Sequence, residues 1–284
     1  LKDTGISVGL LTGSVTPAKK RKLIEQLQDG SIQMVIGTHA LISETVAFKN
    51  LGLVITDEQH RFGVAQRSLL AEKGNHPHML VMSATPIPRT LALIIYGDLD
   101  ISVLDELPPG RQTIETYAIS SRKRARALQY IRTHLDAGQQ AYIICPLVEE
   151  STNDMASVVQ YANALQTETF PDKVIGILHG KMKPKEKDTV MTAFANGKID
   201  VLVSTTVVEV GVDVPNAVII LIENAVRYGL SQLHQLRGRV GRGNKKSTCI
   251  LVSDAQNEEA IARLKILCST SDGLRIADED LRLR

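Results

Sequence analysis

The sequence predicts an α/β fold with two tandem domains, each built on a parallel β-sheet, followed by a short C-terminal helical segment. Two observations support this prediction. Short apolar runs alternate with helical patterns along the chain, which is typical of parallel sheets, and one strand–helix–strand unit occurs twice. The 284 residues suffice for two domains of ordinary size, and a hydrophobic content of 43% supports a core in each.

Strands are expected wherever a short apolar run stands between turn residues. In the first half of the chain the candidates are Gly9–Leu11, Met34–Ile36, Leu53–Ile55 and Met79–Met82. In the second half they are Ala141–Cys145, Ile175–Leu178, Val201–Val203, Val218–Ile222 and Thr248–Val252.

A linker is predicted between the two halves, because Pro108, Pro109 and Gly110 interrupt both periodicities. Near the C-terminus, apolar residues at helical spacing indicate a helix over Glu258–Cys268, which Asp272 and Gly273 end. The predicted parts are therefore a first domain over 1–105, a linker over 106–121, a second domain over 122–255 and a helical segment over 256–284.

The two halves repeat one another. A shift of 167 positions places residues 9–38 on residues 176–205 without gaps. In each copy a strand ends at glycine, a helix begins near proline, and a second glycine ends that helix. This punctuation favours duplicated domains over two unrelated units, and a ligand is expected between such domains. The identical pairs are Gly9/Gly176, Leu11/Leu178, Gly13/Gly180, Pro17/Pro184, Lys20/Lys187, Gly30/Gly197, Ile32/Ile199 and Thr38/Thr205.

Composition narrows the function only slightly. The net charge of +2 does not by itself indicate a nucleic-acid partner, and no apolar run is long enough for a membrane span. The three cysteines lack metal-ligand spacing, so we expect free thiols in a reducing cytoplasm. The chain begins with Leu1 and has no signal-peptide pattern, so we expect a fragment or a processed product.

Asp57-Glu58-Gln59-His60 is the most informative stretch. It follows the buried strand that ends at Ile55, and two acids at such a strand end face either solvent or a cation and a catalytic cleft. Ser83-Ala84-Thr85-Pro86 closes the next strand along the chain. Because neighbouring parallel strands end together, these hydroxyls are expected at the same sheet edge as Asp57, unless they only cap a helix.

A basic stretch near the C-terminus indicates phosphate binding. Between Arg227 and Lys246 there are six basic side chains and no acid, in the setting Gln235-Leu236-Arg237-Gly238-Arg239-Val240-Gly241-Arg242. Arg239 and Arg242 are three residues apart and would share one face of a helical turn. Paired guanidinium groups grip phosphate with forked hydrogen bonds. The glycines indicate close backbone approach, which a merely solvated basic face would not need.

Further strand ends carry small polar groups. Gly211 and Asp213 follow a predicted strand, and Asp213 would bond a ribose or an arginine of the basic stretch, or else belong to a structural turn. Backbone amides and small hydroxyls also end other strands, where they suit a sugar–phosphate backbone that is bound without sequence readout. These residues are Gly13, Thr38, His39, Gly180 and Thr205.

One expected element does not occur in the sequence. No Gly-x-x-x-x-Gly-Lys-Ser/Thr phosphate loop occurs in the 284 residues. The nearest approach, Gly176–Met182, has the wrong spacing and places Met182 where a hydroxyl is needed. The residues that normally cradle the β- and γ-phosphates of a nucleotide are therefore not among those given.

Taken in order, the motifs resemble those of superfamily 2 helicases, and in particular those of bacterial ATP-dependent branch-migration helicases. The resemblance covers nearly the whole chain and implies two tandem RecA-like domains, the first of them truncated. The stretches that carry it are Gly37–Leu41, Asp57–Val64, Ser83–Thr90, Val207–Pro215 and Gln235–Arg242.

The resemblance also implies a role for each motif. Asp57 would hold Mg²⁺ through water, Glu58 would orient the hydrolytic water, and Gln59 and His60 would couple the nucleotide to Ser83 and Thr85. Gly211 and Asp213 would lie at the nucleotide cleft, and Gln235, Arg239 and Arg242 would reach the phosphates. Gly13, Thr38, His39, Gly180 and Thr205 would contact DNA. The implied cofactors are ATP and Mg²⁺, and the implied partner is branched double-stranded DNA, namely replication forks and Holliday junctions, bound by a monomer.

Two other interpretations stay open at this point. The related transcription–repair coupling translocase has similar motifs. Gln59 modestly favours the branch-migration helicase over this translocase. A non-catalytic helicase-like scaffold would use the paired domains only to bind DNA or protein. Because the phosphate loop is not among these residues, the chain by itself is expected not to hydrolyse ATP.

Overall fold

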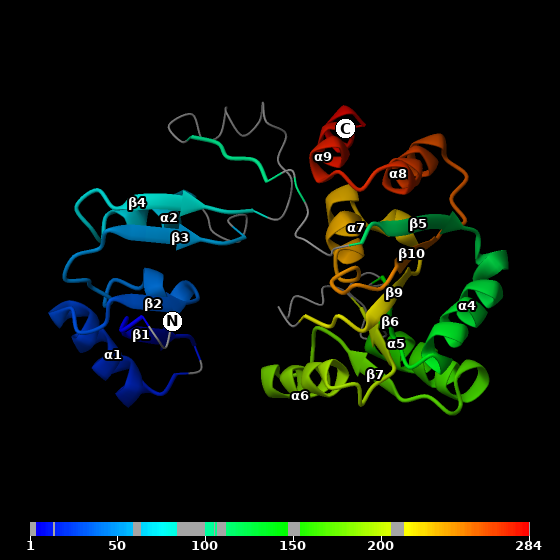
Figure 1. Ribbon diagram of the computed structural model, residues 1–284, viewed down its shortest axis with the longest axis horizontal. Coiled ribbons are helices and arrows are strands. Elements are labelled where there is room, and N and C mark those ends of the chain that lie inside the picture. The colour runs from blue at the N-terminus through cyan, green and yellow to red at the C-terminus, as the bar shows by residue number, and fades with distance from the viewer. Residues whose placement is uncertain are drawn as a thin grey trace. The chain divides into compact units, whose positions relative to one another are not determined.

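The computed structural model describes residues 4–13, 15–58, 64–83, 100–104, 106, 112–146, 154–205 and 213–283. The chain divides into two compact units, unit 1 over residues 1–84 and unit 2 over residues 85–284 (Figure 1). The fold is α/β, as predicted, and within the described residues every strand pairing in both units is parallel.

Among its described residues, unit 1 contains two two-stranded sheets, β1–β2 and β3–β4. A small core forms where helix α1 covers one face of β1 and β2, around Leu11, Leu23 and Leu27. The helix begins at Pro17 and ends at Gly30, whose φ of 80° favours glycine. The elements are β1 (Val8–Leu11), α1 (Pro17–Asp29), β2 (Met34–Gly37), the 3₁₀ turn η1 (His39–Ile42), β3 (Leu53–Thr56), α2 (Val64–Ala71) and β4 (His78–Val81).

Unit 2 is a three-layer domain around one six-stranded parallel sheet, with strand order β5-β10-β9-β6-β8-β7. Its first strands and helices are β5 (Ile114–Ile119), the 3₁₀ turn η3 (Ser121–Lys123), α4 (Arg124–Asp136), β6 (Gln140–Ile144), α5 (Asp154–Ala164) and the π-type turn η4 (Leu165–Thr169). The repeated unit follows as β7 (Ile175–Leu178), α6 (Pro184–Ala195) and β8 (Val201–Ser204). The last elements are β9 (Ala217–Ile222), the 3₁₀ turn η5 (Ala225–Arg227), α7 (Leu230–Arg237), β10 (Ser247–Val252), α8 (Glu258–Ser269) and α9 (Gly273–Arg282).

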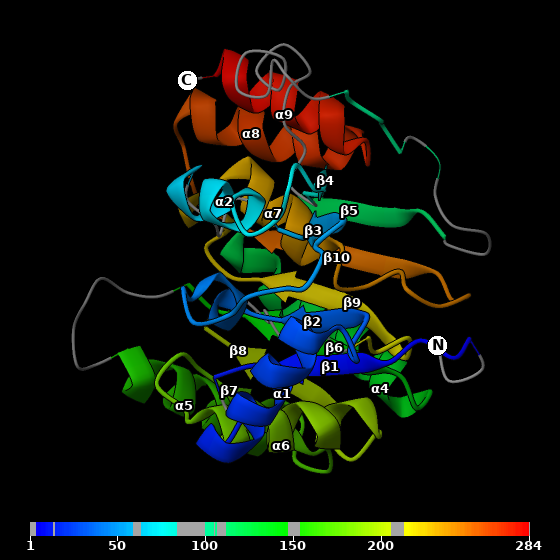
Figure 2. The ribbon, with the colours of Figure 1, turned by 90° about the vertical axis from the view of Figure 1, so that its left-hand side faces the viewer.

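Each face of this sheet has its own core. Helices α4 and α5 cover one face, through residues such as Ile131 and Val158. Helices α6, α7 and α8 cover the other, through residues such as Phe194, Leu233 and Leu264. Helices α8 and α9 lie beside α7 in both views (Figures 1 and 2). No helix that the structure describes is long and apolar enough to cross a membrane.

The sequence predicted nine of these strands, and the structure confirms them within one residue at either end. Two predictions need correction. Residues 114–119, which fall within the predicted linker, form β5, the edge strand beside β10. The C-terminal segment holds a second helix, α9, because the Asp272 carboxylate accepts hydrogen bonds from the amides of Leu274 and Arg275 and so caps it. The other domain boundaries stay predictions.

The internal repeat is a structural repeat. Val8 pairs with Met34 in unit 1, and the positions 167 later, Ile175 and Val201, pair in the same way in unit 2. Gly9 is closely packed, because a Cβ there would lie 2.5 Å from a methyl carbon of Leu23 and 3.2 Å from one of Ile32. Its counterpart Gly176 would meet Ile199, the counterpart of Ile32, at 2.7 Å. The same pair, a strand glycine and an isoleucine of the connection that follows the helix, is therefore in close contact in both units.

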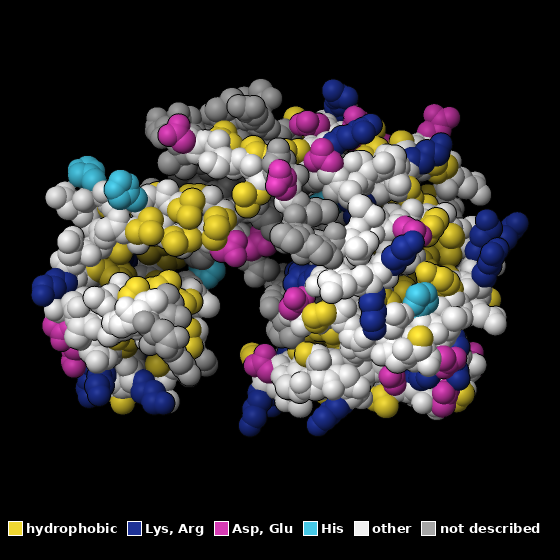
Figure 3. All heavy atoms as spheres, viewed as in Figure 1, with side chains coloured by type: hydrophobic (Ala, Val, Ile, Leu, Met, Phe, Trp, Pro, Cys, Tyr) yellow, Lys and Arg dark blue, Asp and Glu magenta, His cyan; other side chains and the backbone are white. Residues whose placement is uncertain are grey.

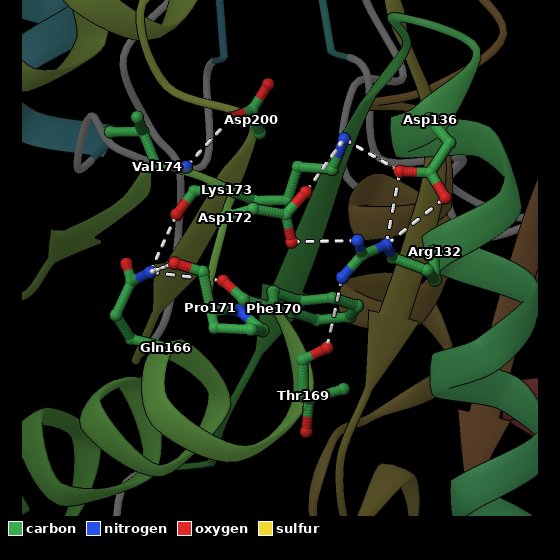
Figure 4. Close-up of polar contacts among 10 residues, drawn as sticks. All are labelled: Arg132, Asp136, Gln166, Thr169, Phe170, Pro171, Asp172, Lys173, Val174 and Asp200. Carbon is green, nitrogen blue, oxygen red and sulfur yellow. Dashed lines mark hydrogen bonds and ion pairs between the residues drawn. The ribbon is translucent and has the colours of Figure 1, made fainter.

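A polar cluster fixes the joint between α5 and β7 (Figure 4). The chain leaves α5 through the π-type turn η4, and the Gln166 amide donates to the carbonyl oxygens of Phe170 and Lys173 at 3.1 and 2.8 Å. This cluster lies at the amino end of β7, away from the strand ends that carry the predicted site, so we assign it a structural role. Its ion pairs are Arg132–Asp136, Arg132–Asp172, Lys173–Asp136 and Lys173–Asp172.

Candidate functional site

The acidic pair lies where β3 ends. Asp57 and Glu58 follow Thr56 directly, and the Glu58 amide donates a 2.8 Å hydrogen bond to Asp57 Oδ1. Glu58 has a φ of 51°, a left-handed backbone that costs a non-glycine residue about 1–2 kcal/mol. The turn therefore holds both carboxylates at the carboxyl end of the strand, and Asp57 is exposed there.

Ser83 is at the same edge as this pair. Thr56 pairs with Val81 in the parallel register, and the Met82 amide donates to the Thr56 carbonyl at 2.8 Å. Continuing the register puts Ser83 level with Glu58, in agreement with the expectation that neighbouring strands end together. Gln59, His60 and Thr85 lie outside the described residues, as does Gly211 in unit 2.

The two arginines of the basic stretch lie in a turn, which corrects the predicted helical face. Helix α7 ends at Arg237, and Arg239 and Arg242 follow it. Gly241 turns the chain with a φ of 75°, and Arg242 Nε donates to the Gly238 carbonyl at 3.0 Å. Gln235 is half-buried in the last turn of α7. The turn, and not helical periodicity, therefore determines where both guanidinium groups lie.

Asp213 pairs with an arginine, one of its two predicted partners. Its Oδ1 lies 3.6 Å from Nη1 of Arg242, and both side chains reach solvent. Burial raises the pKa of the Tyr142 phenol to about 12, and the positive charges of Arg239 and Arg242 act in the opposite direction. Val240, which lies between the two arginines in the chain, packs in the same core as Tyr142 of β6.

The close approach expected at the glycines is intramolecular. A Cβ on Gly241 would lie 2.8 Å from Ile114 of β5, and a Cβ on Gly243 would lie 2.8 Å from the carbonyl oxygen of Pro215. A Cβ on Gly238 would meet only ordinary contacts at 3.4 Å. Gly241 and Gly243 are therefore explained by packing within unit 2, without any ligand.

Arg237 does not belong to the exposed basic face, although sequence analysis counted it there. It is 2% exposed, and its Nη1 donates to the carbonyl oxygens of Leu267 and Thr270 at 2.7 and 2.8 Å. It joins α7 to the end of α8. Its position seven residues after Leu230, on the apolar face of α7 that also carries Leu233, was the signal that could have identified it as buried.

The predicted DNA-contacting residues end neighbouring strands in both units. The Thr38 amide donates to the Leu11 carbonyl at 3.2 Å, and the Thr205 amide donates to the Leu178 carbonyl at 3.3 Å. Thr38 and His39 are exposed. Gly13 and Gly180 are exposed too, and a Cβ on either would meet nothing within 4 Å. Each unit therefore has an open glycine beside a threonine at one strand edge.

The edge in unit 2 also contains unsatisfied polar atoms. His179 Nδ1, Ser204 Oγ and Thr205 Oγ1 are buried and have no hydrogen-bond partner within the described part of the chain. They follow or end β7 and β8, which pair side by side through Leu178 and Ser204. Buried polar atoms are usually paired, so three together indicate a place for a polar ligand or water.

A second buried group, which sequence analysis did not identify, lies where β9 ends. Arg124 donates to both carboxylate oxygens of Glu223, at 2.9 and 2.8 Å, and the Tyr161 hydroxyl donates to the first of them at 2.7 Å. The Glu223 amide binds the Ile144 carbonyl of β6. Nearby, burial raises the pKa of the Cys145 thiol to about 12, which keeps it protonated at neutral pH.

Two helicase family models and several known proteins match the chain. The DEAD/DEAH box helicase family matches residues 1–94, and the helicase conserved C-terminal domain matches residues 122–244. The protein named ATP-dependent DNA helicase RecG is 52% identical in Synechocystis sp., over 98% of this chain and 34% of its own length. The protein of the same name in Aquifex aeolicus is also 52% identical, over 100% of this chain and 36% of its own length.

A solved structure agrees with these relatives. The structure of RecG bound to a three-way DNA junction is 48% identical, with a TM-score of 0.80, and covers 100% of this chain and 37% of that one. The chain thus spans about a third of the length of the relatives it matches. These sequence relatives and this solved structure all have the name RecG. The chain belongs, over the residues given, to the RecG family of superfamily 2 helicases.

Proposed function

We propose that this chain is the motor region of an ATP-dependent double-stranded DNA translocase that acts on branched DNA, reversing forks and migrating Holliday junctions during recombination and repair. The observation that carries the proposal is 52% identity, over 98% or more of the chain, to proteins named ATP-dependent DNA helicase RecG. A relative's structure bound to a three-way DNA junction supports the branched substrate. We propose that the protein works as a monomer at the nucleoid in the bacterial cytoplasm.

ATP and Mg²⁺ are the proposed cofactors, and the acidic edge of unit 1 has suitable ligands for the metal. Mg²⁺ prefers oxygen ligands and is usually held by one or two carboxylates together with substrate phosphates and water. Asp57 is exposed at its strand end and has a second carboxylate oxygen beyond the one that binds the Glu58 amide. Asp57 would hold the metal through water, and Glu58 would orient the water that attacks the γ-phosphate.

The remaining proposed roles concern coupling and charge. Gln59 and His60 would relay the nucleotide state to Ser83 and Thr85. From unit 2, Arg239 and Arg242 would stabilise the negative charge that develops on the phosphates. Gln235 would reach the phosphates as well, and Gly211 and Asp213 would lie beside the bound nucleotide.

The DNA backbone is the proposed ligand of the strand edges. Gly13, Thr38 and His39 would contact it from unit 1, and Gly180 and Thr205 from unit 2. The unpaired buried polar atoms at residues 179, 204 and 205 support this assignment, because phosphate and sugar oxygens would satisfy them.

Unwinding by a full-length RecG polypeptide that carries these 284 residues tests the proposal. A labelled three-way junction should be unwound with ATP and Mg²⁺, and Glu58→Gln should abolish both unwinding and ATP hydrolysis while DNA binding persists. If DNA binds but neither activity appears in the unsubstituted protein, the non-catalytic scaffold is the correct interpretation.

The 284-residue polypeptide by itself is expected to show no ATP hydrolysis above background, with or without DNA, because its residues do not include a phosphate loop. The measurement is steady-state phosphate release at saturating ATP. Glu58→Gln, produced in parallel, controls for a contaminating ATPase. Hydrolysis that the unsubstituted polypeptide performs and Glu58→Gln loses would contradict the prediction.

DNA binding by the same polypeptide is expected to be weak, indifferent to sequence and strongly dependent on salt, because backbone contacts act largely through counterion release. Fluorescence anisotropy with two fork substrates of unrelated sequence should give equal affinities. Both affinities should fall by about tenfold or more between 50 and 200 mM salt. An affinity that survives the higher salt, or that differs strongly between the sequences, would refute backbone readout.

Gly13→Ala and Gly180→Ala are each expected to weaken DNA binding by about tenfold, or roughly 1.4 kcal/mol, without changing stability. A methyl group at either position meets no protein atom within 4 Å, so any effect must arise from the bound ligand. Gly52→Ala is the matched control, because Gly52 has equally open surroundings but lies at the amino end of β3. Equal affinities for all four proteins would exclude close approach of DNA at these glycines.

A further inference from the structure

Packing and turn geometry account for five of the eight identical pairs in the internal repeat. In each unit a leucine lies in the core, a strand glycine packs against an isoleucine, a proline begins the helix, and a glycine of positive φ follows it. These five pairs are Gly9/Gly176, Leu11/Leu178, Pro17/Pro184, Gly30/Gly197 and Ile32/Ile199.

Three identical pairs are left, and contacts within the fold do not account for them. A Cβ on either glycine would meet nothing within 4 Å. Neither lysine side chain has a hydrogen-bond or ion-pair partner within the described part of the chain. The threonine of unit 2 is 2% exposed, and its Oγ1 is buried without a partner among the described residues. The three pairs are Gly13/Gly180, Lys20/Lys187 and Thr38/Thr205.

Both lysines lie on the core-facing side of their helix, close to its beginning. Each is the fourth residue of the helix, about 5 Å along the axis from its start. Lys20 shares a side of α1 with the buried Leu23 and Leu27, and Lys187 shares a side of α6 with the buried Phe194. Because each helix begins just beyond the carboxyl end of a strand, both lysines lie near the edge that carries the glycine and the threonine.

Partial burial distinguishes these two lysines from the basic residues around them. Lys20 and Lys187 are half-buried, whereas Lys19, Arg21 and Lys22 are exposed. Figure 3 shows Lys and Arg side chains at the surface of unit 1 near α1. A lysine whose stem lies against the core keeps its ammonium group at the surface within a restricted range of positions. Lys20 and Lys187 therefore present a localised charge, and their exposed neighbours add a general positive field.

The charge around Lys20 favours an anionic ligand. Residues 4–24 contain four basic side chains and no acid, and all four lie in the first two turns of α1. Positive charge near a helix N-terminus opposes the helix dipole and lowers stability, which a bound anion would offset. In α6 the lysines alternate with Glu186 and Asp188, so the positive field of unit 2 is weaker there.

We infer that Lys20 and Lys187 each donate to a phosphate group of the DNA backbone, in a phosphate site that the chain contains twice. In each copy the open glycine lets the DNA backbone approach, the threonine supplies a hydroxyl group, and the lysine supplies the charge. Phosphate oxygens would also satisfy the unpaired buried hydroxyls of residues 204 and 205. The inference rests on the proposed function, because its ligand is the DNA backbone proposed there, and it adds a cation to each set of contacts.

Methionine substitution separates this role from a structural one. A structural lysine would need only its methylene groups, which cover the edge of the core. Methionine keeps an unbranched apolar stem without the charge, so Lys20→Met and Lys187→Met should leave stability unchanged. Arginine keeps the charge and binds phosphate, so Lys20→Arg and Lys187→Arg should retain DNA affinity.

The test measures the affinity of the 284-residue chain for a labelled DNA fork by fluorescence anisotropy, between 50 and 200 mM salt. Lys20→Met and Lys187→Met should each weaken binding about tenfold at the lowest salt, because each removes a hydrogen bond between charged groups. Each should also reduce the slope of log affinity against log salt by about 0.9, the loss of one phosphate contact. The double variant should reduce the slope by about twice as much.

Lys22→Met and Lys185→Met are the matched controls, because both lysines are exposed on the same two helices. Each should change the affinity by less than about threefold. Thermal unfolding of every variant checks that it folds. Equal losses in Lys20→Met and Lys22→Met would assign the effect to the general field and overturn the inference, as would unchanged affinity in Lys20→Met and Lys187→Met. In those cases the proposed DNA contacts would stand, whereas an unsubstituted chain that binds no DNA would refute both.

Discussion

Replacing Arg242 with alanine, in a full-length RecG polypeptide that carries these residues, is expected to lower kcat for ATP by about a thousandfold with little change in KM. An arginine that reaches the phosphates stabilises charge that exists mainly in the transition state. Its contact with Asp213 is loose, at 3.6 Å between two solvent-reaching side chains, and such pairs contribute at most about 1 kcal/mol. Arg242 can therefore leave Asp213 for a phosphate at little cost.

Two further variants distinguish the loss of the specific guanidinium contact from the simple loss of a positive charge. Arg242→Lys should recover little activity, because an ammonium group cannot make the forked contact of a guanidinium group. Arg126→Ala removes an exposed arginine of α4 and should leave kcat unchanged. A fall confined to KM for Arg242→Ala would mean that the residue binds the ground state and transition state equally, and would contradict the assigned role.

Much of the fold was predictable because unit 2 follows simple periodic rules. Strands such as Val201–Ser204 are short apolar runs bounded by polar turns, and proline and glycine mark the ends of the helices between them. The rule that parallel strands end together then predicted, from the sequence alone, that Asp57 and Ser83 lie at one edge of the sheet, as the register of β3 and β4 confirms. This reasoning depends only on local pattern and strand direction, which the sequence contains.

The rest depended on tertiary contacts that leave no periodic signal. Strand β5 has the sequence Ile-Glu-Thr-Tyr-Ala-Ile, which lacks a regular alternation and lies next to a proline-rich stretch. Only its pairing with β10 distinguishes it from a linker. Arg237 is basic but buried, because two carbonyl oxygens at the end of α8 accept its hydrogen bonds. Arg239 and Arg242 came together through a turn at Gly241 and not through a helix.

Replacing Arg124 with leucine is expected to lower the free energy of unfolding of unit 2 by about 2–3 kcal/mol. The substitution removes both guanidinium hydrogen bonds and leaves the Glu223 carboxylate buried, with the Tyr161 hydroxyl as its donor. Removing one partner of a fully buried pair costs about 3–5 kcal/mol, and we expect less here because the Arg124 side chain is 39% exposed and therefore screened by water.

A double substitution shows whether the buried carboxylate is the cause. With Glu223→Leu added to Arg124→Leu no charge remains to be desolvated, and the double variant should regain at least about 1 kcal/mol over the single one. Hydrogen exchange of the buried amides in β6 and β9 measures the unfolding of unit 2 separately from that of unit 1. A double variant less stable than Arg124→Leu would mean that Glu223 contributes mainly by packing. The network would then stabilise the end of β9 through shape, and the ion pair would be incidental.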